Sequence, residues 1–266
     1  KKKKKKKNDL VRLNLGGYFM NSTVKSILDH RSIRNYTSRS IEDDKLQAIL
    51  DCAQASPSSI NGQQMSIILV KDQKTKDAIA ELAGGQPWIS QAPVFMLFVA
   101  DFYRAKLAAE KSGEELVIAS NMEGTLVGSI DVGLAMGHAI AAAESMGLGT
   151  VCIGGIRNNP DKMIDLLNLP EYVYPMVGLC VGYPNMDDIP AQKPRFPQEA
   201  VIHSEKYNQN LHDTLDAYDK TITDYMAQRT GGKDTRDWSG YVSGIYNKVY
   251  FPKVSGTLKD QKFHCE

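Results

Sequence analysis

Four short apolar runs in the sequence have the length and composition of buried strands. They cover residues 65–70, 93–100, 150–153 and 175–181. A continuous apolar run, in which polar residues do not alternate with apolar ones, is typical of a strand covered on both faces. Helical patterns separate these runs. The pattern therefore predicts a layered α/β or α+β core.

The helical patterns differ in strength. Residues 41–55 repeat apolar side chains at the helical period, and Asp43 and Asp44 near the start complement the helix dipole. Shorter helices are predicted at residues 23–30, 75–82 and 160–167. After about residue 201 no further buried strand is predicted. Amphipathic segments at residues 211–228 and 241–250 indicate a helical extension that packs on the body or on a partner subunit.

The longest helical pattern, residues 115–146, is rich in small residues. Gly128, Gly133 and Gly137 lie within it, among several alanines. Each glycine inside a helix costs about 1 kcal/mol relative to alanine. Such a helix persists when close packing compensates, and we predict a buried central helix at a subunit interface. His138 in this pattern is interpreted as a satisfied buried histidine rather than a catalytic base.

Charge and cysteine content restrict the class of protein. The formal net charge of +1 includes seven lysines at residues 1–7, and the rest of the chain carries −6. We interpret residues 1–19 as an added tag or a disordered leader, with Met20 as the natural start, rather than as a nucleic-acid arm or membrane tether. The apolar runs predict no membrane span.

The cysteines point to a reducing compartment. Cys52, Cys152, Cys180 and Cys265 are widely spaced and form no C-x-x-C pair or zinc-like cluster. Cys152 and Cys180 fall in apolar runs, where a reduced cysteine behaves as a small hydrophobic residue. We expect free thiols and a cytoplasmic protein.

Polar and basic clusters offer candidate chemistry. His30, Arg31, Ser32 and Arg34 could bind a phosphate, because guanidinium groups give paired hydrogen bonds to phosphate oxygens. The alternative is a basic helix end that complements the helix dipole. Lys193 and Arg195 form a second cationic pair on a loop stiffened by Pro194, and the alternative is an ordinary solvated loop.

Two loops could approach a flat, polar ligand. Residues 58–64 carry hydroxyl and amide groups suited to a heterocyclic or polyhydroxylated molecule, although a polar turn has the same composition. Gly154 and Gly155 follow a strand, where the missing side chains let backbone amides come close to a ring. The chain contains no G-x-S-x-G, H-E-x-x-H or G-x-x-x-x-G-K-[ST] motif. Anion-binding groups without a nucleophile suggest that a bound cofactor carries the chemistry.

In order along the chain, these segments resemble the nitroreductase superfamily, in its branch of NADPH-dependent flavin reductases and oxygen-insensitive nitroreductases. The resemblance runs from about residue 22 to the C-terminus and looks closest to the FMN reductases of Gram-positive bacteria. The matching stretches are HRSIRNYT (30–37), SPSSINGQQ (56–64), ELAGGQPWISQAPVFMLFVADF (81–102), AAAESMGLGTVCIGGIRNNP (141–160), GLCVGYP (178–184), QKPRFP (192–197) and RTGGKDTRDWS (229–239). At Cys152 the chain departs from several relatives, which have an aromatic residue there.

The resemblance implies an α+β fold with a central, mostly antiparallel sheet wrapped by helices. It also implies an intertwined homodimer with an FMN site at the interface, so that residues 20–266 form one FMN-binding domain and residues 201–266 its helical extension. The chain is not expected to bind a metal ion, a nucleic acid or a membrane. The implied function is hydride transfer from NADPH or NADH to bound FMN, and then to a free flavin, nitroaromatic or quinone acceptor.

The resemblance also implies roles for individual residues. Arg34 is the cation near flavin N1 and O2, and Ser58 and Ser59 reach the FMN bound mainly to the other subunit. The implied FMN contacts are His30, Arg31, Ser32, Arg34, Ser58, Ser59, Gln63, Gln86, Ile153, Gly154, Gly155, Lys193 and Arg195. The implied contacts to the NADPH 2′-phosphate are Arg229, Lys233 and Arg236.

Three alternatives remain at the level of sequence. The chain could hold FMN with little turnover. It could use the same fold for another flavin reaction, such as flavin destruction, dehalogenation or azoline oxidation. It could bind nucleic acid through residues 1–7, which predicts salt-sensitive DNA affinity that survives loss of FMN.

Overall fold

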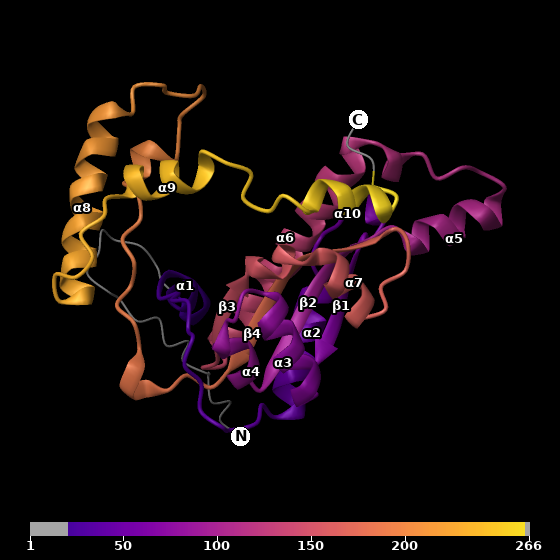
Figure 1. Ribbon diagram of the computed structural model, residues 1–266, viewed down its shortest axis with the longest axis horizontal. Coiled ribbons are helices and arrows are strands. Elements are labelled where there is room, and N and C mark those ends of the chain that lie inside the picture. The colour runs from indigo at the N-terminus through magenta and orange to yellow at the C-terminus, as the bar shows by residue number, and fades with distance from the viewer. Residues whose placement is uncertain (1–20, 264–266) are drawn as a thin grey trace, which may run out of the picture. The chain divides into compact units, whose positions relative to one another are not determined.

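The sheet that the apolar runs predict is present, and it is antiparallel throughout. The computed structural model describes residues 21–263, so the lysine run, Met20 and Cys265 lie outside the described residues. The described chain forms two compact units, one reaching to Pro190 and resuming at Lys253, the other spanning Ala191–Pro252. The sheet belongs to the first unit (Figure 1). Its strand order is β1 (Met65–Val70), β2 (Val94–Asp101), β4 (Val173–Gly182) and β3 (Gly149–Ile153).

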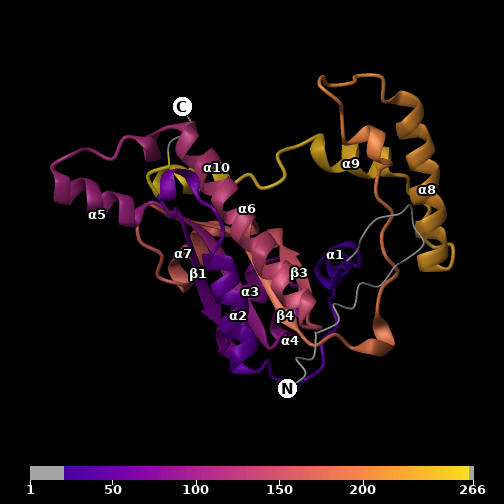
Figure 2. The ribbon, with the colours of Figure 1, turned by 180° about the vertical axis from the view of Figure 1, so that it is seen from behind.

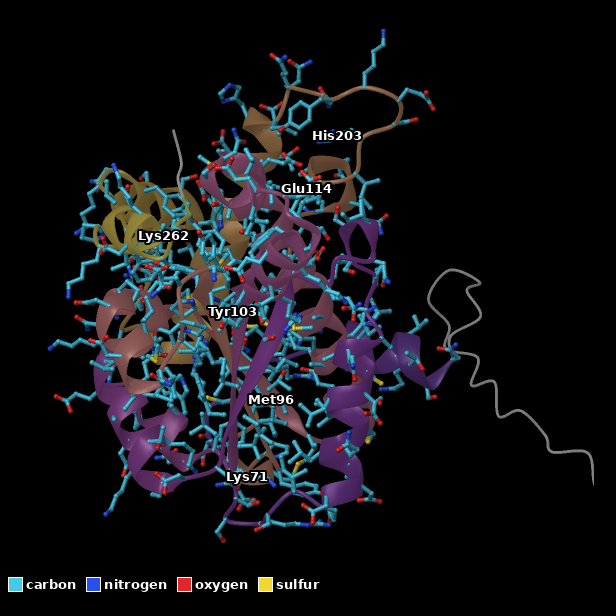
Figure 3. All side chains as sticks on the ribbon, turned by 90° about the vertical axis from the view of Figure 1, so that its right-hand side faces the viewer. Lys71, Met96, Tyr103, Glu114, His203 and Lys262 are labelled. Carbon is cyan, nitrogen blue, oxygen red and sulfur yellow. The ribbon has the colours of Figure 1, made fainter. Side chains whose placement is uncertain are left out.

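The central strand β2 explains why the strands have no polar alternation. Every residue of β2 is buried. Phe95 and Leu97 pack into one hydrophobic cluster, whereas Met96 and Phe98 pack into another on the opposite face. Met96, labelled in Figure 3, is fully buried between the helical layers. A strand covered on both faces needs apolar side chains at every position.

Helices cover both faces of the sheet (Figures 1 and 2). One face packs against α2 (Asp43–Gln54) and α6 (Met122–Ser145), which supply Ile49 and Ala135 to the core. The other face packs against α3 (Gln73–Leu82), α4 (Pro87–Gln91) and α7 (Pro160–Leu166). The fold is therefore α+β with a helix-wrapped antiparallel sheet, as predicted.

The remaining helices are peripheral. In the first unit, α1 (Ser22–Leu28) contacts α6, α5 (Tyr103–Ser112) buries no residue, and α10 (Val254–Asp260) adds Leu258 to a third hydrophobic cluster. In the second unit, α8 (His212–Thr230) contacts α9 (Trp238–Tyr246). Single 3₁₀ turns occur at Ser59–Asn61, Ile118–Ser120, Gly154–Asn158, Met186–Asp188 and Gln198–Ala200.

Several predicted boundaries were wrong. The helix predicted from residue 115 begins at Met122, because the Asn121 side chain accepts the Glu123 N–H and caps the helix there. The helix predicted at 241–250 begins at Trp238, where Asp237 accepts the Gly240 N–H. Three helices, α4, α5 and α10, were not predicted. Two are very short, and α5 has no buried face whose period the sequence could reveal.

Helix α6 is longer than the short strand-like runs from which no membrane span was predicted. Among the described residues it is long and apolar enough to cross a bilayer, with a mean hydropathy of 1.5 over its most apolar window. The helix packs against α2 and β2, and its Asp131 and Glu144 accept hydrogen bonds from other segments. These contacts are those of a core helix. A core helix can meet the same criteria of length and composition as a membrane span.

A polar cluster around Tyr183 fastens the start of α2 to the end of β4. The Tyr183 hydroxyl donates to Glu42 Oε2 at 2.5 Å, and Lys45 Nζ donates to the same hydroxyl at 2.6 Å. The Arg39 guanidinium lies 4.0 Å from the Tyr183 ring centroid and pairs with Glu42 Oε1. The hydrogen bond from Tyr183, aided by backbone amide and Arg39 contacts, lowers the pKa of Glu42 to about 2.

We predict that Glu42→Gln reduces stability at neutral pH and that this deficit shrinks in acid. The folded state favours the ionised carboxylate, so its contribution is present above about pH 4.5 and is lost as pH falls towards 2. Urea midpoints of both proteins measured across this range should converge. Glu114→Gln, at an exposed side chain in the loop after α5, is the control and should follow the wild type. A deficit that does not change with pH would contradict the prediction.

Candidate functional site

The segment that carries the first basic cluster lies along the edge strand β3. Ser32 forms a parallel bridge with Thr150, and the Ile33 N–H donates to the Thr150 carbonyl at 2.8 Å. A Cβ at position 149 would lie 2.7 Å from Ile33 Cγ1, so only glycine permits this approach. Residues 30–34 are thereby held beside the outer edge of the sheet.

A glutamate that sequence analysis missed orients His30. Glu144 Oε1, on the last turns of α6, lies 2.7 Å from His30 Nδ1 and accepts from Thr150 Oγ1 at 2.8 Å. Because the carboxylate only accepts, His30 Nδ1 carries the hydrogen of this contact. The Glu144 side chain is only 11% exposed. No motif in the sequence links it with a histidine 114 residues away.

Three further predicted residues meet near the end of β3. The Arg34 guanidinium lies 5.6 Å from the Trp88 ring centroid, and Trp88 is two residues from Gln86. A Cβ at Gly155 would lie 2.3 Å from Gln86 Nε2, which shows how closely the amide approaches the glycine backbone. We call residues 30–34, Gln86 and 153–155 the edge-strand cluster. It joins distant parts of the sequence around the end of one strand.

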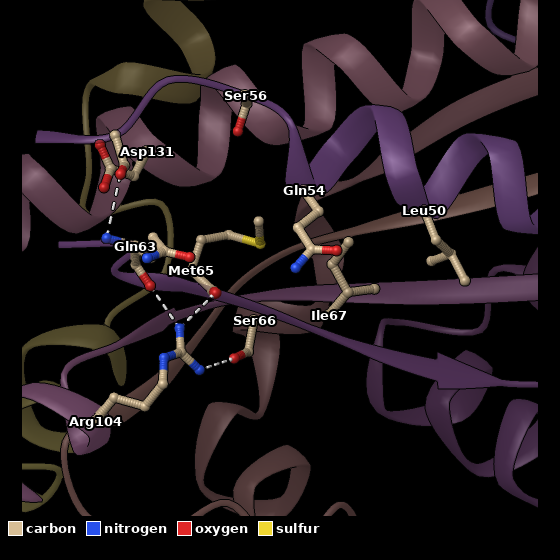
Figure 4. A pocket seen from close by; sticks show the side chains of 10 residues that line it. Leu50, Gln54, Ser56, Gln63, Met65, Ser66, Ile67, Arg104 and Asp131 are labelled. Carbon is tan, nitrogen blue, oxygen red and sulfur yellow. Dashed lines mark hydrogen bonds between the residues drawn. The ribbon is translucent and has the colours of Figure 1, made fainter. Parts of the chain in front are cut away.

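The second group of predicted residues lies at the other edge of the sheet, before β1. Ser58, Ser59 and Gln63 belong to the loop between α2 and β1, which we call the 58–63 loop. The Ser59 N–H donates to Asp131 Oδ1 at 3.2 Å, and the Gln63 N–H donates to Ser58 Oγ at 3.2 Å. Ser58 and Gln63 line a cavity of about 440 Å³ (Figure 4).

A single first unit does not bring the 58–63 loop and the edge-strand cluster together. The loop leads into β1, whereas the cluster lies on β3, and β2 and β4 separate these strands. On α6 the loop contacts Asp131 and the cluster contacts Glu144, thirteen residues apart. At the rise of an α-helix this is about 20 Å. The two groups therefore lie apart on one chain, and we call them the candidate half-sites.

The second unit contains a cavity lined by cationic and aromatic side chains. Its volume is about 520 Å³, and it is lined by four of the five cations predicted in this region: Lys193, Arg195, Arg229 and Arg236. Aromatic residues Phe196, Tyr218, Tyr225, Trp238 and Tyr241 complete much of the wall. We call this the cationic cavity. Lys233, the fifth cation, is exposed on the loop after α8 and does not line it.

One cation in this cavity already has an anionic partner. Arg236 donates through Nε to Asp234 Oδ1 at 3.0 Å and through Nη2 to Oδ2 at 2.7 Å. This contact lowers the pKa of the Asp234 carboxyl to about 2. The Arg236 guanidinium also lies 5.1 Å from the Tyr241 ring centroid. Asp234 therefore offsets part of the positive charge.

Other observations concern a cavity beside the cluster and the exposure of single residues. Arg31 lines a cavity of about 500 Å³ together with Ile33, Glu144 and Gly149. The prediction of a buried His138 was wrong: its side chain is exposed, with Nδ1 3.2 Å from the Cys52 carbonyl. The described cysteines are free thiols, and Cys152 is exposed on the sheet edge. Among residues 21–263 no cluster of His, Cys, Asp or Glu could hold a metal ion.

Two family models match the chain. The Nitroreductase family matches residues 27–183, and the Nitroreductase family, C-terminal domain, matches residues 193–266. The first match contains the edge-strand cluster and the 58–63 loop. The second contains the cationic cavity. The two matches meet close to the boundary between the compact units.

Individual relatives agree with the family models. The chain is 50% identical over 250 residues to an FMN reductase [NAD(P)H] of Bacillus subtilis, covering 93% of this chain and all of that protein. It is 37% identical over 225 residues to an NADPH-flavin oxidoreductase of Vibrio harveyi, covering 85% of this chain and 91% of that protein. The structure of B. megaterium NfrA2 superposes with a TM-score of 0.90 at 49% identity, covering 93% of this chain and all of that one. The chain therefore belongs to the nitroreductase family.

Proposed function

We propose that the chain is an FMN-dependent oxidoreductase that takes hydride from NADPH or NADH and reduces a flavin, nitroaromatic or quinone acceptor. The proposal rests mainly on the edge-strand cluster, in which Arg34, Gln86 and Gly155 converge. The relatives that match nearly the whole chain are named for the same chemistry, as FMN reductase, NADPH-flavin oxidoreductase and oxygen-insensitive NADPH nitroreductase.

The edge-strand cluster fits a flavin. Gly154 and Gly155 present backbone without side chains, and the Gln86 amide beside them can hydrogen-bond a heterocycle. Among the described residues the buried Trp88 indole N–H has no hydrogen-bond partner, so the wall beside the cluster retains an unused donor. The ring centroid of Trp88 lies 5.6 Å from the Arg34 guanidinium. When bound, FMN would supply the hydride-accepting chemistry, and the residues around it would bind and orient it. His30, Arg31, Ser32, Ile153, Lys193 and Arg195 are proposed as further FMN contacts.

Arg34 is proposed to act electrostatically. Arg34 is exposed, and the hydrogen bond that its guanidinium donates to the Ser32 carbonyl is long, at 3.5 Å. A cation held at the edge of the ring stabilises negative charge that develops there during hydride transfer. His30, whose Nδ1 contacts Glu144, can present Nε2 to the ligand.

A homodimer would unite the two half-sites. Met122, Leu126, Ile130 and Leu134 are 40–60% exposed and recur every four residues on α6. They form an apolar stripe along the helix. A Cβ at Gly133 or Gly137 beside this stripe would contact nothing, so there is open space for a close partner. We propose that a second chain covers the stripe and that Ser58, Ser59 and Gln63 of each chain complete the FMN site of the other.

The cationic cavity supports NADPH as a donor. The 2′-phosphate of NADPH needs a cation, and an aromatic wall suits the adenine. Arg229 lines the cavity at the end of α8, and among the described residues no carboxylate pairs with it as Asp234 pairs with Arg236. We propose Arg229 as the main contact, with Arg236 and Lys233 contributing less.

Two further properties are proposals. A cytoplasmic location agrees with the free thiols Cys52, Cys152 and Cys180. We also propose that the two compact units work as one FMN-binding domain with a helical extension.

The alternative of an FMN-binding protein without turnover is tested by adding NADPH anaerobically to the yellow protein, because bleaching of the flavin bands requires hydride transfer.

We predict that Arg34→Ala slows flavin reduction by at least about tenfold, equivalent to 1.4 kcal/mol of transition-state stabilisation, while FMN remains largely bound. Anaerobic stopped-flow mixing of the FMN-loaded variant with NADPH measures the rate. Arg195→Ala should show the opposite pattern, with weaker FMN binding and a nearly normal rate in the loaded fraction. Reduction of loaded Arg34→Ala at the wild-type rate would remove the electrostatic role.

We predict that Gly155→Ala weakens FMN binding several-fold. The new Cβ would lie 2.3 Å from Gln86 Nε2 and 2.5 Å from the Ala83 carbonyl oxygen, so the backbone beside the ring would have to shift. Gly256→Ala on α10 is the control, because a Cβ there would have no atom within 4 Å and the residue lies outside the proposed FMN site. Fluorescence titration with FMN measures both affinities. Equal affinities for the two variants would contradict the proposed close approach.

We predict that Ile130→Glu weakens the dimer by roughly tenfold or more, because a charge would be buried against an apolar partner surface. FMN affinity should fall with it, since each half-site loses its complement. Sedimentation velocity and FMN titration measure the two effects. Leu107→Glu on α5, at a position that is 45% exposed, is the control. An Ile130→Glu protein that stays dimeric and yellow would place the interface elsewhere.

A further inference from the structure

The 58–63 loop has a strained backbone. Ile60, Asn61 and Gln63 have φ values of 50°, 57° and 53°, in the left-handed region that L-residues rarely occupy. Ile60, at the tip, is 93% exposed, so packing in this chain does not hold it. Strain of this kind persists when the surroundings fix the conformation, and it concentrates at functional sites.

Asp131 holds the entrance of the loop. This residue is only 3% exposed and lies halfway along α6. Its Oδ1 accepts the Ser59 N–H at 3.2 Å, which fixes the backbone at the first residue of the turn. Its Oδ2 is buried and has no hydrogen-bond partner among residues 21–263. A buried acceptor without a partner is costly, so selection for core stability alone does not explain this carboxyl group.

Arg104 holds the exit of the loop (Figure 4). Its Nη2 donates to the carbonyls of Gln63 at 2.5 Å and Met65 at 2.8 Å. Its Nη1 donates to Ser66 Oγ at 2.8 Å and to Asp101 Oδ2 at 2.7 Å. The Asp101 side chain is 10% exposed, so the guanidinium is anchored to a buried carboxylate. The single planar guanidinium therefore fixes two backbone carbonyls, one at the end of the loop and one at the start of β1.

The two clamps enclose the residues assigned to the ligand. Asp131 and Arg104 line the same cavity of about 440 Å³, together with Ser58 and Gln63. The hydrogen bond from the Gln63 N–H to Ser58 Oγ closes the loop across its base. Neither clamp is part of the edge-strand cluster. Both act on the loop backbone, which determines where the Ser58 and Ser59 hydroxyls lie.

We propose that Asp131 and Arg104 are positioning residues, which hold the strained 58–63 loop in the conformation that completes the FMN site of the partner subunit. This inference rests on the proposed function. Asp131 acts through the Ser59 N–H, and Arg104 acts through the Gln63 and Met65 carbonyls. Their substitution should weaken FMN binding by displacing the loop, without any contact of their own to the flavin.

A double-mutant cycle on the FMN-loaded dimer tests the role of Asp131. Asp131→Ala should raise the FMN dissociation constant about tenfold, and Asp131→Asn, which keeps an acceptor for the Ser59 N–H, should recover most of the loss. Ser59→Ala removes only the hydroxyl that the clamp positions. The FMN dissociation constant of the double variant should be no higher than that of the single variant with the lower affinity, because a displaced loop has no serine contact left to lose.

Arg104→Ala supplies an independent arm should Asp131→Ala not fold. It should show the same non-additivity with Ser59→Ala, and Arg104→Lys should not restore binding, since one ammonium cannot reach both carbonyls and Asp101. Ser129→Ala on α6 and Lys106→Ala on α5 control for general effects on the two helices. Both controls should bind FMN as the wild type does.

The possible outcomes separate this inference from the proposed function. Wild-type protein that stays colourless with FMN would overturn the proposed function and the inference with it. Yellow, NADPH-reducible wild type with unchanged FMN affinity in Asp131→Ala and Arg104→Ala would overturn the positioning role alone. Additive losses with Ser59→Ala would also overturn it, because they would indicate general destabilisation of the fold.

Discussion

Both faces of the sheet are covered by helices, and this leaves only the sheet edges and the loops beside them for polar ligands. Strand β2 is buried along its whole length, and its side chains alternate between two separate hydrophobic clusters. No polar group can be placed on either face without a large desolvation cost. The groups that can bind a ligand in this unit therefore collect where β1 and β3 end the sheet.

This arrangement explains why the two groups of candidate ligand residues lie apart on one chain. The edge-strand cluster and the 58–63 loop each depend on α6, which carries Glu144 towards the former and Asp131 towards the latter. The same helix exposes an apolar stripe on its remaining side. A second chain that covers the stripe would bring each loop to the other chain's cluster. Assembly and ligand binding would then be coupled through one helix.

The second unit gathers positive charge around one cavity. Lys193 and Arg195 form one pair of cations and Arg229 and Arg236 another, and all four line the same cavity with aromatic side chains. Asp234 offsets the charge of Arg236, whereas Lys233 lies outside the cavity. A negatively charged ligand group would therefore meet cations of unequal availability. This difference depends on local hydrogen bonds and is invisible in a count of basic residues.

The sequence by itself determined the four strands, the longer helices, the absence of a known nucleophile motif and the family. These properties follow from local periodicity and from ordered motifs, which need no knowledge of contacts between distant residues. Exposed helix α5 and the cap at Asn121 escaped prediction because neither alters the apolar period strongly.

Only the tertiary structure decided how the candidate residues are grouped. It paired His30 with Glu144, brought Gln86 against Gly155, and identified Asp131 and Arg104 as clamps of a strained loop. It also showed that His138, which the sequence pattern had placed in the core, is exposed to solvent. Hydrogen bonds between residues far apart in the chain depend on strand order and helix packing. These arise from the whole chain at once, so no local pattern encodes them.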